Sequence, residues 1–175
     1  EAIESERDLL VPLVSKADLV IDTTSLSLYE LRDLIKVRVS GRKSQELALL
    51  FQSFGFKHGV PNDADYVFDV RCLPNPYWDP KLRVYTGLDK PIIEFLRHQE
   101  ETQSMKSDII AYLEKWLPKF QDSNRSYMTV AIGCTGGQHR SVFICQELGN
   151  YFKDRFNSVQ IRHKELTGFE KKHPE

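Results

Sequence analysis

Residues 127–142 read Tyr-Met-Thr-Val-Ala-Ile-Gly-Cys-Thr-Gly-Gly-Gln-His-Arg-Ser-Val, an apolar segment that passes through a Gly-rich turn into a helix pattern. At such a turn the backbone N–H groups point the same way, and the helix N-terminus adds a partial positive charge. Gly136 and Gly137 permit the curled backbone that gathers amides into an anion-binding nest. His139 and Arg140 add side-chain donors. The stretch predicts a strand, a turn and a helix that together bind phosphate or carboxylate.

The same stretch matches Cys-x5-Arg-Ser, the phosphate loop of cysteine-dependent phosphatases, and this gives an alternative hypothesis. Cys134 would be the nucleophile, because a helix N-terminus and a nearby arginine favour the thiolate. Arg140 would bind the phosphate oxygens, Ser141 would assist, and Asp79 would be the general acid. Gly133 stands where these enzymes usually carry a histidine, which argues against this hypothesis. A third hypothesis is that the loop binds the phosphate of a nucleotide or of an RNA backbone.

The pattern around this stretch predicts one α/β core. Strands alternate with helices, which indicates a mainly parallel sheet flanked by helices. The expected strands are Asp18–Thr23, Leu47–Phe51, Tyr66–Val70, the strand before the Gly-rich turn, and Ser158–Arg162. The expected helices include one that begins at the capping box Ser27–Glu30, one near 89–98, one near 102–117 that ends before Pro118, and one after the Gly-rich turn. Ser40–Ser44 is the expected linker.

Composition narrows the class of protein. The 175 residues are 41% hydrophobic and carry a formal net charge of −1, which gives no general attraction to nucleic acid or membrane. No segment approaches the length of a transmembrane helix. The three cysteines, Cys72, Cys134 and Cys145, have no metal-site spacing and are too few for a disulfide framework, so we expect a cytoplasmic protein without a metal. Cys145 is expected in the core.

The candidate binding residues follow the predicted strands. Ligands of an open parallel sheet bind at the carboxyl ends of its strands, and the long loop after Val70 could cover that edge. The polar residues expected there are His58, Arg71, Tyr77, Arg83, Thr135, His139 and Arg140. Arginine binds phosphate bidentately and histidine adds a proton-dependent donor. For three of them the sequence leaves an alternative open: His58 could simply lie in a turn, Arg71 could pair with Asp69 or Asp65, and Tyr77 could anchor the loop by packing on the core.

Several long strings resemble the RapZ/YvcJ family of bacterial RNase adapter proteins. They cover residues 54–59, 64–71, 73–76, 86–91 and 133–142. The family has an N-terminal nucleotide-binding domain of the Walker type, and this chain has no G-x-x-x-x-G-K-[ST] motif. The resemblance therefore implies a fragment of a longer protein, with residues 1–39 ending the ATP- or GTP-binding domain. Residues 40–175 would form the C-terminal domain, a phosphofructokinase-like α/β domain without a cofactor of its own.

The resemblance also implies that the protein is a binding protein and not an enzyme. Members of the family are thought to sense glucosamine-6-phosphate, bind small regulatory RNA and present it to RNase E, which controls amino-sugar synthesis. They are expected to form homo-oligomers in the cytoplasm. The implied ligand residues are Thr135, Gly136, His139 and Arg140, to which the anion-loop analysis adds Cys134, Gly137 and Ser141. The implied RNA-binding residues are Lys153, Arg155, Arg162, His163, Lys164, Lys171 and Lys172.

Two departures from the family pattern bear on these expectations. Tyr77 stands where the family string usually has a histidine, so ligand affinity or its pH response is expected to differ. Glu165, Glu170 and Glu175 interrupt the basic C-terminal residues, so RNA binding is expected to be weaker and more sensitive to salt. Basic residues near the linker would add a second RNA surface: Lys36, Arg38, Arg42 and Lys43.

Overall fold

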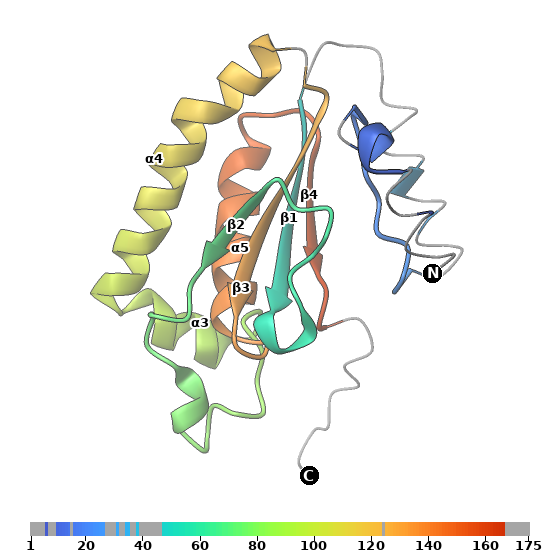
Figure 1. Cartoon of the computed structure of the whole chain (residues 1–175). Helices are drawn as coiled ribbons and strands as arrows, with labels where there is room; N and C mark the ends of the chain where they lie inside the picture. The colour runs from blue at the N-terminus through green and yellow to red at the C-terminus, as the bar shows by residue number, and fades with distance from the viewer. Residues whose placement is uncertain are drawn as a thin grey trace.

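The computed structural model describes residues 6, 10–14, 16–26, 31, 34–35, 38, 47–123 and 125–166. Its centre is a four-stranded sheet in which all neighbouring strands are parallel (Figure 1). The strands are β1 (Ala48–Gly55), β2 (Tyr66–Asp69), β3 (Tyr127–Cys134) and β4 (Val159–His163), in the spatial order β2-β3-β1-β4. The mainly parallel α/β fold predicted from the sequence is confirmed.

The two central strands are buried on both faces. All residues of β3 are buried, as are all those of β1 after Ala48. Their continuous apolar runs are typical of strands covered on both sides. The register pairs Gly55 with Cys134, so both strands end at the same edge of the sheet. Because β1 continues to Gly55, the loop after it is shorter than the sequence predicted and begins with the short 3-10 helix η1 (Phe56–His58).

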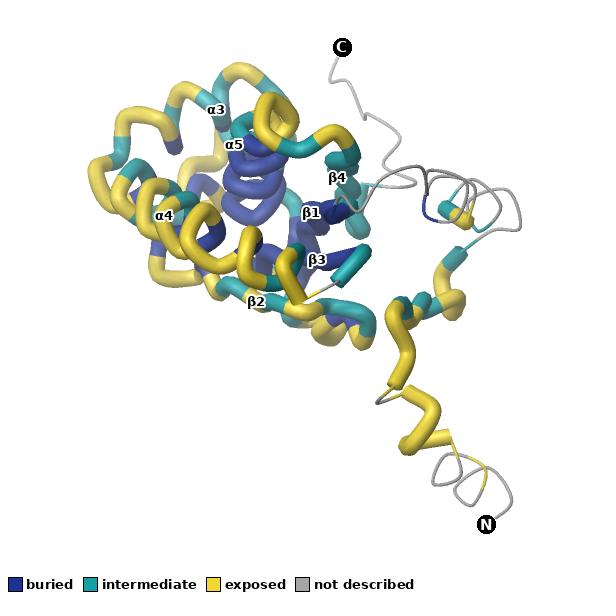
Figure 2. The backbone as a smooth tube through the Cα atoms, turned by 90° about the horizontal axis from the view of Figure 1, so that it is seen from above, coloured by how far each residue is buried: buried dark blue, intermediate teal, exposed yellow. Residues whose placement is uncertain are grey.

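Three helices pack on one face of the sheet, and the described part of the N-terminal segment lies on the other side (Figures 1 and 2). They are α3 (Lys90–Arg97), α4 (Glu100–Asp122) and α5 (Arg140–Lys153). The stacked rings of Phe51 and Phe152, 5.5 Å apart, join β1 to α5. Each such fully buried side chain stabilises the fold by roughly 1.5–3 kcal/mol. Cys145 is also fully buried in this core, as predicted, and burial raises the pKa of its thiol.

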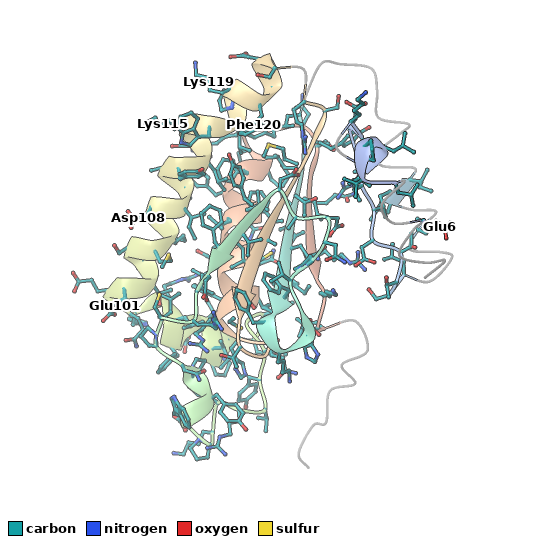
Figure 3. All side chains as sticks on the ribbon, viewed as in Figure 1. Glu6, Glu101, Asp108, Lys115, Lys119 and Phe120 are labelled. Carbon is teal, nitrogen blue, oxygen red and sulfur yellow. The ribbon has the colours of Figure 1, made fainter. Side chains whose placement is uncertain are left out.

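Helix α4 does not end at Pro118, and that prediction is wrong. The helix continues to Asp122 with Pro118 inside it. Proline removes one backbone hydrogen bond from a helix interior, so another interaction must hold the last turns. Leu117 is fully buried, and the ring of Phe120 meets that of Tyr66 at 5.9 Å. Figure 3 shows Phe120 on the inner side of α4, with Asp108 and Lys115 pointing outward. Packing of the inner face outweighs the lost bond.

The predicted strand Asp18–Thr23 is also wrong. These residues adopt irregular, bent backbone and pair with none of the four described strands. A strand is stable only where its backbone groups find a partner strand. Arg38, expected on a basic RNA surface, is buried and donates to Thr129 Oγ1 at 3.5 Å, so its guanidinium is not available to RNA. The predicted capping box, the linker and the other basic residues near the linker lie outside the described residues.

The segment between β2 and α3 is long and irregular, as predicted. It contains the 3-10 helix η2 (Pro76–Trp78) and returns to the carboxyl edge of the sheet. There Gly87 N donates to the carbonyl of Gln138 at 2.8 Å. The described helices include none that is long and apolar enough to cross a membrane.

Candidate functional site: the loop between β3 and α5

The Gly-rich turn Thr135–His139 connects β3 to α5 at the carboxyl edge of the sheet. Gly137 has φ +73°, a conformation that side chains other than glycine rarely adopt. A Cβ on Gly137 would lie 2.6 Å from Gly55 N, and one on Gly55 would lie 2.7 Å from the carbonyl carbon of Gly136. The turn is therefore pressed directly against the end of β1. This contact sets the direction in which α5 begins.

The N-terminus of α5 has no side-chain cap. His139 occupies the cap position without a capping hydrogen bond. In the part of the chain that the structure describes, the amides of Arg140, Ser141 and Val142 have no hydrogen-bond partner, nor do those of Gly136 and Gln138. Ser141 and Val142 are fully buried. A buried helix start without partners is unusual, and a bound anion satisfies such amides well.

Arg140 lies beneath this turn with 5% of its surface exposed. Its Nη1 donates to the carbonyl oxygens of Arg71 at 2.7 Å and Leu73 at 3.0 Å. Its Nη2 lies 3.4 Å from Thr135 Oγ1. Its Nε is buried and finds no hydrogen-bond partner among the residues that the structure describes. One edge of the guanidinium therefore braces the segment after β2, while Nε keeps a free donor beside the turn.

Cys134 ends β3 and is buried beneath the loop, with 3% of its surface exposed. Its Sγ lies 3.1 Å from Ser141 Oγ and accepts from the amide of Gly137 at 3.3 Å. The sulfur thus joins the strand, the turn and the first turn of α5. These contacts keep the turn curled over the sulfur.

His139 is held by the long loop rather than turned to solvent. Its Nε2 lies 2.7 Å from the carbonyl oxygen of Tyr85. Burial lowers the pKa of His139, and the nearby Arg140 lowers it further, while the hydrogen bond to Tyr85 acts in the opposite direction. The imidazole is therefore neutral at pH 7, and its contact with a carbonyl means that Nε2 carries the proton.

The long loop touches the start of α5 through Gly87. A Cβ there would lie 2.3 Å from the carbonyl oxygen of His139 and 2.6 Å from Phe143 N. Only glycine lets the two backbones approach so closely. Together with the bonds to His139 and Arg140, this contact makes the loop one wall of the site.

Glu165, which follows β4, forms a second wall beside the end of β1. Its Oε1 accepts from Gly55 N at 3.4 Å, and its Oε2 lies 3.5 Å from His58 Nε2. Its Cγ lies 2.3 Å from the point where a Cβ on Gly137 would stand. The sequence analysis treated Glu165 only as an interruption of the basic tail. The sequence signal that could have identified it is its position two residues after the last residue of β4, because polar residues at the carboxyl ends of parallel strands gather at one edge of the sheet.

A family model described as the RapZ C-terminal domain matches residues 47–167. The chain belongs to the RapZ family. A second model, the RapZ-like N-terminal domain, matches residues 1–43. The family resemblance drawn from the sequence strings is thereby confirmed.

Similar proteins carry two kinds of name. The chain is 65% identical over 166 residues to a protein of Marinobacter nauticus and 63% identical over 167 residues to one of Hahella chejuensis, both named nucleotide-binding protein. It is 56% identical over 165 residues to the RNase adapter protein RapZ of Yersinia pseudotuberculosis. These matches cover 94–95% of the chain but only 56–58% of the relatives. The chain thus spans little more than half the length of these relatives.

The other predicted ligand residues of this RapZ-family chain lie at the same edge but are engaged differently. Arg71 forms a bidentate pair with Asp69, whose pKa this pairing lowers, and its guanidinium lies 4.1 Å from the centre of the Phe56 ring. Tyr77 lies in η2, half exposed, with the Arg83 guanidinium 4.8 Å from its ring centre. The Arg83 side chain donates from Nε to the carbonyl oxygen of Tyr77 at 2.6 Å, while the Arg83 backbone forms a hydrogen bond with His139 that raises the pKa of that ring.

The predicted RNA-binding residues lie at the far end of α5 and along β4. Arg155 pairs with Glu114 at 3.3 Å and lies over the ring of Tyr151. The ring of His163 is bound on both sides, by Ser53 Oγ at 2.9 Å and Gln146 Oε1 at 3.1 Å. The structure also describes Lys153, Arg162 and Lys164, whereas Lys171 and Lys172 lie outside the described residues. Over the described chain, no group of three His, Cys, Asp or Glu residues is placed to hold a metal.

Proposed function

We propose that this chain is the ligand-sensing and RNA-binding part of an RNase adapter, and that the turn Thr135–His139 binds the phosphate of glucosamine-6-phosphate. One observation carries the proposal. The start of α5 is buried and uncapped, and the unpaired Nε of the buried Arg140 lies beside it. Amides at a helix N-terminus and a guanidinium are suited to a phosphate dianion. The adapter role is supported by the name of the Yersinia relative.

In this proposal the chain binds without catalysing. The ligand would favour one arrangement of the protein because it binds the alternatives unequally. A small regulatory RNA would bind the basic residues around the end of α5 and β4, and the adapter would present it to RNase E. We further infer a cytoplasmic homo-oligomer in which residues 1–39 complete a nucleotide-binding domain and residues 40–175 form the sensing domain. The names of the two relatives called nucleotide-binding proteins support the assignment of residues 1–39 to a nucleotide-binding domain.

Calorimetric titration tests the ligand. The protein is titrated with glucosamine-6-phosphate, glucose-6-phosphate and inorganic phosphate. We expect the amino-sugar phosphate to bind most tightly. The variant Arg140→Lys keeps the charge but loses Nε and the planar donor set, so we expect at least tenfold weaker binding. Arg97→Lys on the exposed face of α3 is the matched control and should bind like the wild type. Unchanged affinity in Arg140→Lys, with the fold intact by circular dichroism, would contradict the proposed site.

A cysteine-dependent phosphatase is the second candidate, because Ser141 Oγ and the Gly137 amide both lie within hydrogen-bond distance of the Cys134 sulfur. Both contacts would hold the sulfur of a nucleophilic cysteine in a fixed position. Against it, Arg140 Nη1 is occupied by two backbone carbonyls and the sulfur is buried. Phosphate release from p-nitrophenyl phosphate that disappears in Cys134→Ser would establish this activity. We expect no release from either protein.

A further inference from the structure

Glu165 places a carboxylate beside a loop proposed to bind an anion. Its side chain is only 14% exposed, and it packs on Gly137, the residue with positive φ at the centre of the turn. A phosphate bound by the turn would therefore lie close to a negative charge in a partly desolvated place. Such proximity disfavours a simple anion, because opposing like charges weaken binding most where water is excluded.

The contacts that Glu165 makes leave acceptor positions of its carboxylate unoccupied. The hydrogen bond from Gly55 N is long, at 3.4 Å, and the His58 ring is 3.5 Å away on an exposed side chain. An ionised carboxylate has about four acceptor positions, so several remain. A positively charged group on the ligand would fit this oxygen pair while the phosphate met the turn.

We propose that Glu165 is the specificity-determining residue of the loop and makes it select ligands that carry an ammonium group as well as a phosphate. This inference rests on the proposed function of the turn. A sugar phosphate with a neutral hydroxyl in place of the ammonium group meets the same repulsion from Glu165 without the compensating ion pair. Inorganic phosphate has no ammonium group, so Glu165 only weakens its binding to the turn. The selectivity arises from repelling one class of ligand as well as attracting the other.

The variant Glu165→Gln separates charge from shape. Wild type and variant are titrated by calorimetry with glucosamine-6-phosphate, glucose-6-phosphate and inorganic phosphate. The ratio of the dissociation constants for the two sugar phosphates is expected to fall at least tenfold in Glu165→Gln, and inorganic phosphate should bind several-fold more tightly. Glu101→Gln, an exposed position on α4 (Figure 3), is the matched control and should keep the wild-type ratio.

The other outcomes contradict either the role of Glu165 alone or the proposed function of the turn as well. If Glu165→Gln binds the three ligands with the wild-type ratio, Glu165 does not determine specificity, although the turn still binds anions. If neither wild type nor variant binds any of the three, the proposed function of the turn fails and this inference fails with it. Thermal unfolding of the variant, compared with the wild type, shows that any change in the ratio comes from a folded protein.

Discussion

Arg140 Nη1 donates to the carbonyl oxygen of Arg71 at 2.7 Å and so ties the first turn of α5 to the backbone that follows β2. The same atom donates to Leu73 O at 3.0 Å. A residue expected to face only a ligand therefore also holds the segment that forms one wall of the site. This double role means that stability and binding should change together when Arg140 is replaced.

Replacing Arg140 with Ala should lower the free energy of unfolding. The change leaves two carbonyl oxygens without their donor, and hydrogen bonds to a charged group contribute about 1.5–3 kcal/mol each. We expect a loss of about 3 kcal/mol, measured by urea unfolding at pH 7.5. Arg83→Ala, which removes an exposed guanidinium bonded to Tyr77 O, is the comparison and should cost under about 1 kcal/mol. Equal costs would show that the bonds to Arg71 and Leu73 contribute little.

The variant Gly87→Ala should push the long loop away from α5. Its Cβ would meet backbone atoms of His139 and Phe143, which have little freedom to move. Overpacking of this kind costs about 1–3 kcal/mol, and we expect sugar-phosphate binding to weaken because the wall of the site shifts. Gly136→Ala is the matched control for stability alone, since the nearest atoms to its Cβ belong to the flexible Lys57 side chain at 3.9 Å. If both variants unfold at the same temperature as the wild type, the close approach is not required.

Stability should fall as the solution is acidified below about pH 6.5. Burial lowers the pKa of both His139 and His163, so the unfolded chain binds protons that the folded chain does not. The contribution of each histidine is fully present above the unfolded value of 6.5 and is lost as pH falls through the folded value, at no more than about 1.4 kcal/mol per pH unit. Urea unfolding between pH 8 and 5 measures this slope.

The variant His163→Asn keeps a hydrogen-bonding side chain but cannot be protonated in this range. Its slope below pH 6.5 should be smaller than that of the wild type, and the remainder should come from His139. A wild-type slope in His163→Asn would mean that burial does not keep the His163 ring neutral in the folded state.

The local sequence pattern was sufficient to predict the central strands and the turn between β3 and α5. Their signals are short-range: continuous apolar runs and two adjacent glycines. The errors arose where distant contacts decide. Pro118 reads as a helix end, yet Phe120 packs on Tyr66 from another element and extends α4. Asp18–Thr23 reads as a strand, yet the described chain offers it no neighbouring strand to pair with.

The sequence predicted which residues form the site better than it predicted their hydrogen-bond and ion-pair partners. The sequence analysis predicted that Cys134 and Arg140 lie at the same turn, because they are within seven residues of each other. It did not predict that Arg140 binds the backbone after β2, nor which of two carboxylates pairs with Arg71. Glu165 was missed as a wall of the site because its approach to Gly137 depends on the order of strands in space, with β4 beside β1.

Replacing Pro118 with Ala should stabilise the protein. Alanine restores the backbone donor inside α4, where proline is less favourable than alanine by about 3 kcal/mol. Part of that gain is offset because proline also restricts the unfolded chain, by about 1 kcal/mol. We expect the free energy of unfolding to rise on the order of 1–2 kcal/mol, measured by urea unfolding. Lys119→Ala, at the next position, is the control and should change little. A loss of stability in Pro118→Ala would mean that the proline sets a bend in α4 that the contact between Phe120 and Tyr66 requires.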